Sequence, residues 1–159
     1  MPTPYASYVT GADPLDVLRT TLAGYREVFG RHTAADWARP WAPGKWTSHQ
    51  VMVHVTQWEL IFSTRIRTAL AIPNYVVQPM DQDDLLNIEA PAVDVATAIA
   101  AFEAVRRMNV ALVSGLTPAH RATAIRHPER GPIDIEDLIV TLAGHGAHHL
   151  SQLRASIED

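Results

Sequence analysis

The sequence predicts an all-α protein, an antiparallel four-helix bundle, on three observations. Four segments of about twenty residues carry apolar side chains at intervals of three and four, the spacing of one face of an α-helix. Each segment begins at a residue type that caps helices, and prolines or glycines separate the segments. No segment of similar length alternates apolar and polar residues as a strand would. With 159 residues, the chain is expected to form one domain over residues 1–159.

The first helix is expected at residues 13–30. The carboxylate of Asp13 can accept hydrogen bonds from the free amides of the first turn, and Pro14 suits the first helical position. Gly30 ends the apolar pattern. The side chains predicted to face inward are Leu15, Leu18, Leu22, Tyr25 and Phe29.

The second helix is expected at residues 47–71. Thr47 and Gln50 are spaced as a capping box, and Pro73 follows the end because proline cannot continue a helix. The side chains predicted to face inward are Val51, Val55, Trp58, Phe62 and Ala69. The long connection that follows, residues 73–91, suits either the rim of a binding site or plain surface packing.

The third and fourth helices are expected at residues 94–114 and 134–157, with room for a short hairpin over residues 123–133 between them. Similar loops, each with a proline and a glycine, precede the second and fourth helices, which predicts that both helices begin at the same end of the bundle. The predicted inward side chains are Val95, Ile99, Phe102, Val105 and Leu112 in the third helix, and Ile135, Leu138, Leu142, His145, His149 and Leu153 in the fourth.

The composition excludes several classes of protein. A formal net charge of -4 offers no basic surface for nucleic acid, and no apolar run approaches the roughly 18 residues of a membrane helix. The chain has no cysteine, which excludes disulfides, thiolate metal ligands and a cysteine nucleophile. The N-terminal residues lack the basic and apolar segments of a signal peptide. The protein is therefore expected to be cytoplasmic, without a nucleic-acid or membrane partner.

The fourth helix carries three histidines within five residues, His145, His148 and His149. At about 100° per residue, His145 and His149 lie roughly 40° apart on the apolar face, whereas His148 falls on its shoulder. Two imidazoles on a buried face need partners for their nitrogens, and one divalent cation would serve both. Backbone carbonyls or water molecules are the alternative partners.

A third ligand is predicted on the second helix. His54 lies at the flank of its apolar face, whereas His49 is expected to point into solvent. The sequence thus predicts a metal site formed by His54, His145 and His149. Gln152, one turn beyond His149, is either a group that orients an imidazole or the metal's water, or a residue at the rim. The histidines expected at the surface are His32, His120 and His127.

Three segments resemble motifs of the DinB/YfiT-like superfamily. GKWTSHQVMVHVTQWE (residues 44–59) is similar to the second-helix motif, and RHPERGPIDIEDLIVTLAGHGAHHLSQL (residues 126–153) is similar to the last segment. MDQDD (residues 80–84) resembles an acidic stretch in the central loop. The similarity runs over nearly the whole chain, in order. It implies a four-helix bundle in which the ligands of one divalent metal, commonly zinc or nickel, are His54, His145 and His149.

The resemblance also implies a metal-dependent enzyme that acts on a small molecule. Members are described as metal-dependent hydrolases, and some transfer a low-molecular-weight thiol such as bacillithiol or mycothiol. Three imidazoles leave a coordination position open, where a water or a thiol would be activated. No carboxylate lies near the histidines in sequence to act as a general base, which favours thiol S-transfer. A non-catalytic metal-binding or stress-related protein is the alternative.

A homodimer is expected on two grounds. Many members of the superfamily form dimers, so the resemblance implies one here. The apolar content, 47% of residues, is also high for a single small bundle, and a shared helix face could bury part of it across a two-fold axis.

Overall fold

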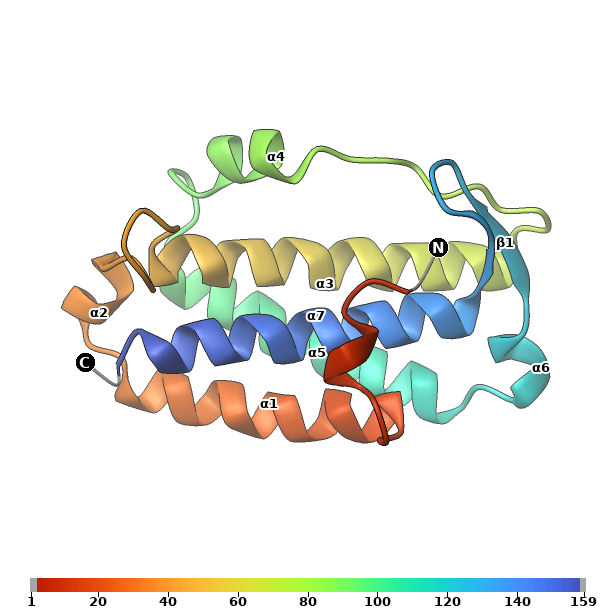
Figure 1. Cartoon of the computed structure of the whole chain (residues 1–159), viewed down its shortest axis with the longest axis horizontal. Helices are drawn as coiled ribbons and strands as arrows, with labels where there is room; N and C mark the ends of the chain where they lie inside the picture. The colour runs from red at the N-terminus through yellow and green to blue at the C-terminus, as the bar shows by residue number, and fades with distance from the viewer. Residues whose placement is uncertain (1–2, 158–159) are drawn as a thin grey trace.

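In a computed structural model, which describes residues 3–157, four long helices pack side by side (Figure 1). All four were predicted, and every predicted end lies within two residues of the observed one. Of the described helices, none is long and apolar enough to cross a membrane. The long helices are α1 (Pro14–Arg31), α3 (Ser48–Ala71), α5 (Val95–Ser114) and α7 (Ile135–Ala155).

The predicted caps position these helices. In each case the side chain of the residue before the helix accepts a hydrogen bond from an amide of the first turn, which stabilises a helix by about 1 kcal/mol. At two of these residues the backbone amide also donates to the side chain three residues further on, which completes a capping box. The capping residues are Asp13, Thr47, Asp94 and Asp134.

Helices α1 and α7 run parallel to one another. The Tyr25 hydroxyl donates to the carbonyl of Gly146 near the middle of both helices, and the imidazole of His32 contacts the Ser156 hydroxyl at their ends. Helices α3 and α5 also run parallel, whereas α3 runs antiparallel to α7 and α1 runs antiparallel to α5 (Figure 1).

The expectation that the second and fourth long helices begin at the same end is wrong, because α3 and α7 are antiparallel. The connection between α3 and α5 returns along the bundle to the end where α3 begins, so α5 repeats the direction of α3 (Figure 1). Helix α7 begins directly after the hairpin, at the end of the bundle where α5 ends, and runs back in the opposite direction (Figure 1). The long connection between α3 and α5 contains a further helix, α4 (Gln82–Glu89).

Shorter elements lie at the two ends of the bundle, and one of them, near the N-terminus, lies across the side of α7 (Figure 1). The expected hairpin is present as an antiparallel pair of strands, which lead directly into α7. The connection between α3 and α5 is hydrogen-bonded to this hairpin, because the amide of Val77 donates to the carbonyl of Arg126 at 2.8 Å. The short elements are the 3-10 helix η1 (Ala6–Tyr8), α2 (Ala34–Ala38), α6 (Pro118–Arg121), β1 (Ala124–His127) and β2 (Gly131–Asp134).

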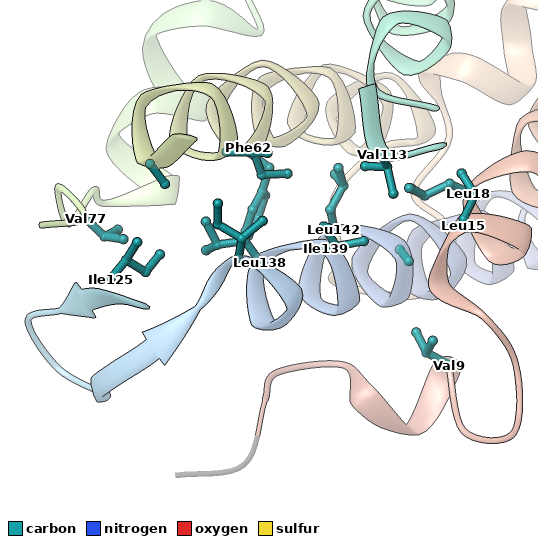
Figure 2. Packing of buried hydrophobic residues seen from close by; sticks show 14 residues of the cluster. Val9, Leu15, Leu18, Phe62, Val77, Val113, Ile125, Leu138, Ile139 and Leu142 are labelled. Atoms are coloured by element: carbon teal, nitrogen blue, oxygen red, sulfur yellow. The ribbon is translucent and has the colours of Figure 1, made fainter. Parts of the chain in front are cut away.

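The apolar core has two parts, with a polar layer between them. Figure 2 shows the part nearer the hairpin, where Phe62, Leu138 and Leu142 pack together. The other part surrounds Phe102 and Leu153. Between the two parts, α7 contributes His145 and His149 to the interior.

A buried ion pair belongs to the same polar layer. The guanidinium of Arg106 donates to both carboxylate oxygens of Glu59, at 2.8 and 2.7 Å, and to the Thr21 hydroxyl at 2.9 Å. The predicted inner face of the third helix is therefore wrong in part, because apolar spacing could not find buried polar residues. The buried residues of α5 are Ala98, Phe102, Arg106, Asn109 and Val113.

Candidate metal centre

The three histidines predicted as ligands meet between α3 and α7. His54 comes from α3, and His145 and His149 come from α7, one turn apart. One ring nitrogen of each lies within 4.8 Å of those of the other two, and the Nε2 atoms of His54 and His145 are 3.0 Å apart. The side chains are almost fully buried, with 2–4% of their surface exposed. We call these three residues the histidine cluster.

The nitrogens of the cluster fit a metal ion better than they fit one another. Two nitrogens bound to one tetrahedral metal at about 2.1 Å lie roughly 3.4 Å apart, close to the separation of the His54 and His145 Nε2 atoms. A hydrogen bond between those two rings would still leave the buried Nε2 of His149 without a partner. Leaving a buried polar atom unpaired costs about 1–3 kcal/mol. A cation bound by all three rings would remove this cost.

Burial keeps the cluster uncharged. It lowers the pKa of His54 to about 3 and that of His149 to about 4, with smaller contributions from neighbouring histidines. Burial likewise holds the pKa of His145 well below its usual value. Neutral imidazole is the form that binds metals, so at neutral pH all three rings offer a lone pair.

These low pKa values predict that the metal-free protein loses stability in mild acid. Between pH 6.5 and about 4 the unfolded chain protonates His149 while the folded protein does not, so stability falls as the pH falls through this window. A shift of this size corresponds to about 3 kcal/mol. Urea denaturation of metal-free protein across this range should show the loss, and the His149→Gln variant should show a smaller one. Equal losses in both proteins would contradict the prediction.

Gln152 joins the cluster to a second hydrogen-bonded pair. Its Oε1 accepts from Nδ1 of His149 at 2.7 Å, and its Nε2 lies 3.2 Å from Nε2 of His148. The remaining nitrogen of His148 lies 2.7 Å from the Tyr8 hydroxyl. A proton on Nδ1 of His149 leaves the lone pair on Nε2, the atom that faces no other partner. His148 itself is half-buried and lies outside the cluster, as predicted from its position on the shoulder of the helix.

Two glycines beside His145 allow other segments to approach the helix. A Cβ atom on Gly144 would overlap the backbone carbonyl of Tyr5, and one on Gly146 would lie 2.8 Å from the guanidinium of Arg106. The N-terminal segment thus crosses α7 next to the cluster, where the Tyr5 and His145 rings pack edge to face at 5.3 Å between centroids.

We predict that Gly144→Ala destabilises the protein, because the backbone at Tyr5 must move away from α7. Overpacking of this kind costs about 1–3 kcal/mol. Gly30→Ala is the matched control, since it also lies in a helix and its new Cβ would meet no atom within 4 Å. Chemical denaturation should show a loss of stability for Gly144→Ala and none for Gly30→Ala. Similar free energies of unfolding for the two variants would refute the close approach.

A cavity of about 210 Å³ lies beside His145. The long connection, predicted as a possible rim, contributes only Gln82 to its lining. The hairpin contributes His127 and Arg130, so the expectation that His127 is a surface residue is wrong. Nothing in the sequence pattern indicated that the N-terminal segment would line this cavity. The stretch RHPERG, which holds His127 and Arg130, was recognised only as part of the family motif. The lining residues are Pro4, Tyr5, Trp58, Phe62, Arg65, Gln82, His127, Arg130, Leu138, Thr141 and His145.

The remaining histidines have structural partners or lie at the surface. His49 does not point freely into solvent as expected: it is half-buried, and its Nε2 donates to the carbonyl of Val93 at 2.8 Å. The expectation that His32 lies at the surface is also wrong, because it is half-buried with both ring nitrogens hydrogen-bonded. His120 is exposed, as expected. None of these three belongs to the histidine cluster.

Two solved structures share this fold. YfiT from Bacillus subtilis, described as a candidate metal-dependent hydrolase with an unusual four-helix bundle topology, has a TM-score of 0.81 and 19% sequence identity. The match covers 90% of this chain and 83% of YfiT. TT2238, described as a four-helix bundle protein, has a TM-score of 0.64 and 20% identity, covering 89% of this chain and 96% of its own. At these identities the likeness shows the fold alone.

Sequence relatives point to the same family. A protein of Oceanobacillus iheyensis, named as a candidate metal-dependent hydrolase, is 27% identical over 110 residues, which are 69% of this chain and 64% of that protein. The matched region is thus less than two thirds of that relative. A protein of Bacillus pumilus with the same description is 23% identical over 145 residues, 91% of this chain and 83% of its own. The family model of the DinB superfamily matches residues 18–153. The chain therefore belongs to the DinB superfamily.

Proposed function

We propose that the histidine cluster binds one divalent metal ion and that the protein is a metal-dependent hydrolase of small molecules. The observation that carries this proposal is the buried set of three uncharged imidazoles, with the unpartnered Nε2 of His149, beside a cavity that reaches His145. Three protein ligands are typical of catalytic sites, whereas structural zinc sites usually have four. When bound, the metal would supply a Lewis acid that activates water for attack on a carbonyl or phosphoryl centre.

The surrounding residues would prepare the site for this chemistry. Gln152 would hold the ring of His149 in one tautomer through its bond to Nδ1. Tyr5, Trp58 and Phe62 would form an apolar wall that limits water around the reacting group. Imidazole ligands suit zinc and nickel, the two metals that we favour. The names of the relatives support hydrolysis as the reaction class.

Thiol transfer is the second candidate, and one observation favours it. The residues that line the cavity, all within the described part of the chain, include no carboxylate to serve as a general base. A thiol such as bacillithiol or mycothiol needs no carboxylate base once a metal lowers its pKa. The thiolate sulfur would then form a bond to an electrophilic carbon as the leaving group departs.

The test is a paired activity screen of metal-loaded protein. Esters, amides and phosphate esters are offered first, and then an electrophile together with bacillithiol or mycothiol. Hydrolysis that disappears with a chelator and in His145→Ala would support the proposal, and turnover only with a thiol would support the second candidate. Bound metal at one per chain without any turnover would favour a non-catalytic role. Activity undiminished in His145→Ala would refute a reaction at this site.

A further inference from the structure

Two arginines line the same cavity as His145, and the first is Arg65 of α3. Its guanidinium lies 5.4 Å from the ring centroid of Trp58 and 5.5 Å from that of Phe62. One N–H donates to the carbonyl of Gln78 at 2.8 Å. A guanidinium has five N–H donors, so others remain for a ligand. Among the described residues, no carboxylate forms an ion pair with Arg65. Its side chain is buried, so an uncompensated positive charge lies in the wall.

The second arginine is Arg130, from the turn of the hairpin. Its side chain is nine-tenths buried, and its Nε is a buried donor without a partner. One terminal nitrogen makes only long contacts, 3.4 Å to Asp137 and 3.5 Å to Thr3. The carboxylate of Asp137 also accepts from the Thr3 hydroxyl and from the amide of Asp134, so it compensates Arg130 incompletely.

His127 shows that the two positive charges act on the same region. Burial lowers the pKa of His127 first, and the charges of Arg130 and Arg65 lower it further. Its Nδ1 accepts long bonds from the amides of Glu129 and Arg130, which places the proton of the neutral ring on Nε2 as a donor. The cavity wall thus offers hydrogen-bond donors from three side chains. Among its described lining residues there is no acid.

We propose that this wall binds the anionic group of a small organic anion, a carboxylate or a phosphate, whose apolar body lies against Trp58 and Phe62. The inference rests on the proposed function, because the reacting end of the molecule would then face His145, and it names the substrate class as anionic and partly apolar. Guanidinium groups bind carboxylates and phosphates through paired donors. An anion here would satisfy the free Nε of Arg130 and neutralise Arg65.

Calorimetric titration with three small probes tests the charge requirement. Phenylacetate and benzylphosphonate carry a carboxylate and a phosphonate, and phenylacetamide has a similar shape without charge. The titrations use metal-free and metal-loaded protein. At least one anion should bind ten-fold or more tightly than the amide, and the stronger of the two identifies the preferred group. Equal affinity for all three probes, or no binding at millimolar concentration, would overturn the proposal.

Two variants and one control locate the site. Arg65→Gln and Arg130→Gln should each weaken anion binding at least ten-fold and leave the affinity for the amide unchanged. Arg67→Gln is the matched control, because Arg67 lies on the same helix but bonds to Ser63 and Asn109 and does not line the cavity. If Arg65→Gln does not fold, Arg130→Gln alone decides. Anion affinity unchanged in a folded Arg130→Gln variant would contradict the assignment.

The test of the anion site can be distinguished from the test of the metal site. Anion binding to metal-free protein does not depend on the histidine cluster, so His149→Ala should retain it. Conversely, Arg65→Gln should retain the metal content of the unmodified protein. Metal bound without anion binding would overturn the anion site only, and anion binding without metal would overturn the proposed function only.

Discussion

Replacing His149 with alanine should remove most of the metal bound by the protein. The change leaves two imidazoles where three converge, and it also deletes the ring that Gln152 holds in place. Loss of a supporting hydrogen bond around a metal costs about 10- to 100-fold in affinity, and loss of a ligand should cost more. Elemental analysis after gel filtration, followed by a competition titration with a chelator, measures both the content and the affinity.

Three matched variants make this prediction specific. His148→Ala and His49→Ala should keep the metal, because neither side chain belongs to the histidine cluster. The metal affinity of Gln152→Leu should lie between that of these two variants and that of His149→Ala, lowered about 10- to 100-fold. Equal metal content in His149→Ala and His49→Ala would refute the choice of ligands.

The second large effect is expected from Glu59→Gln, which breaks the buried ion pair with Arg106. Neither side chain is exposed by more than 1%, so the remaining guanidinium would stay charged without its counter-ion. Breaking such a pair destabilises a protein by about 3–5 kcal/mol. The amide of Asn109 would also lose its charged acceptor at 2.9 Å. The free energy of unfolding in urea measures the loss.

The control is the partly exposed ion pair between Arg26 and Glu103, which joins α1 to α5 at 2.6 Å. Glu103→Gln should cost less than about 1 kcal/mol, because solvent screens this pair. If Glu59→Gln lowers the free energy of unfolding no more than Glu103→Gln does, the buried pair between α3 and α5 does not stabilise the protein more than the exposed pair, and the prediction is wrong.

The long helices could be predicted from the sequence because their determinants are local. Asp13 and Thr47 bond to amides two or three residues away, and apolar periodicity is a property of one segment. The same local geometry placed His145 and His149 on one face and His148 on its shoulder. The metal-binding role of these residues stays a prediction.

The predictions from the sequence fail where contacts between distant segments determine which residues are buried and how a helix is directed. Arg106 is buried because Glu59 lies on a neighbouring helix, and no spacing within α5 could indicate that. The direction of α7 depends on the path of the connection between α3 and α5, not on its entry loop. Tyr5 and Arg130 reach the cavity only through the tertiary fold. Glycine is required at position 144 only because the backbone of Tyr5 crosses α7 there.

X-ray absorption spectroscopy at the metal edge, on protein loaded with one equivalent of zinc or nickel, tests the proposed metal centre most directly. The structure predicts three imidazole nitrogens at about 2.0–2.1 Å and one further ligand that exchanges when azide or a thiol is added. His149→Ala should lose one imidazole from the spectrum or fail to bind the metal. A spectrum without three imidazoles, or one that is identical in His149→Ala, would contradict a metal held by His54, His145 and His149.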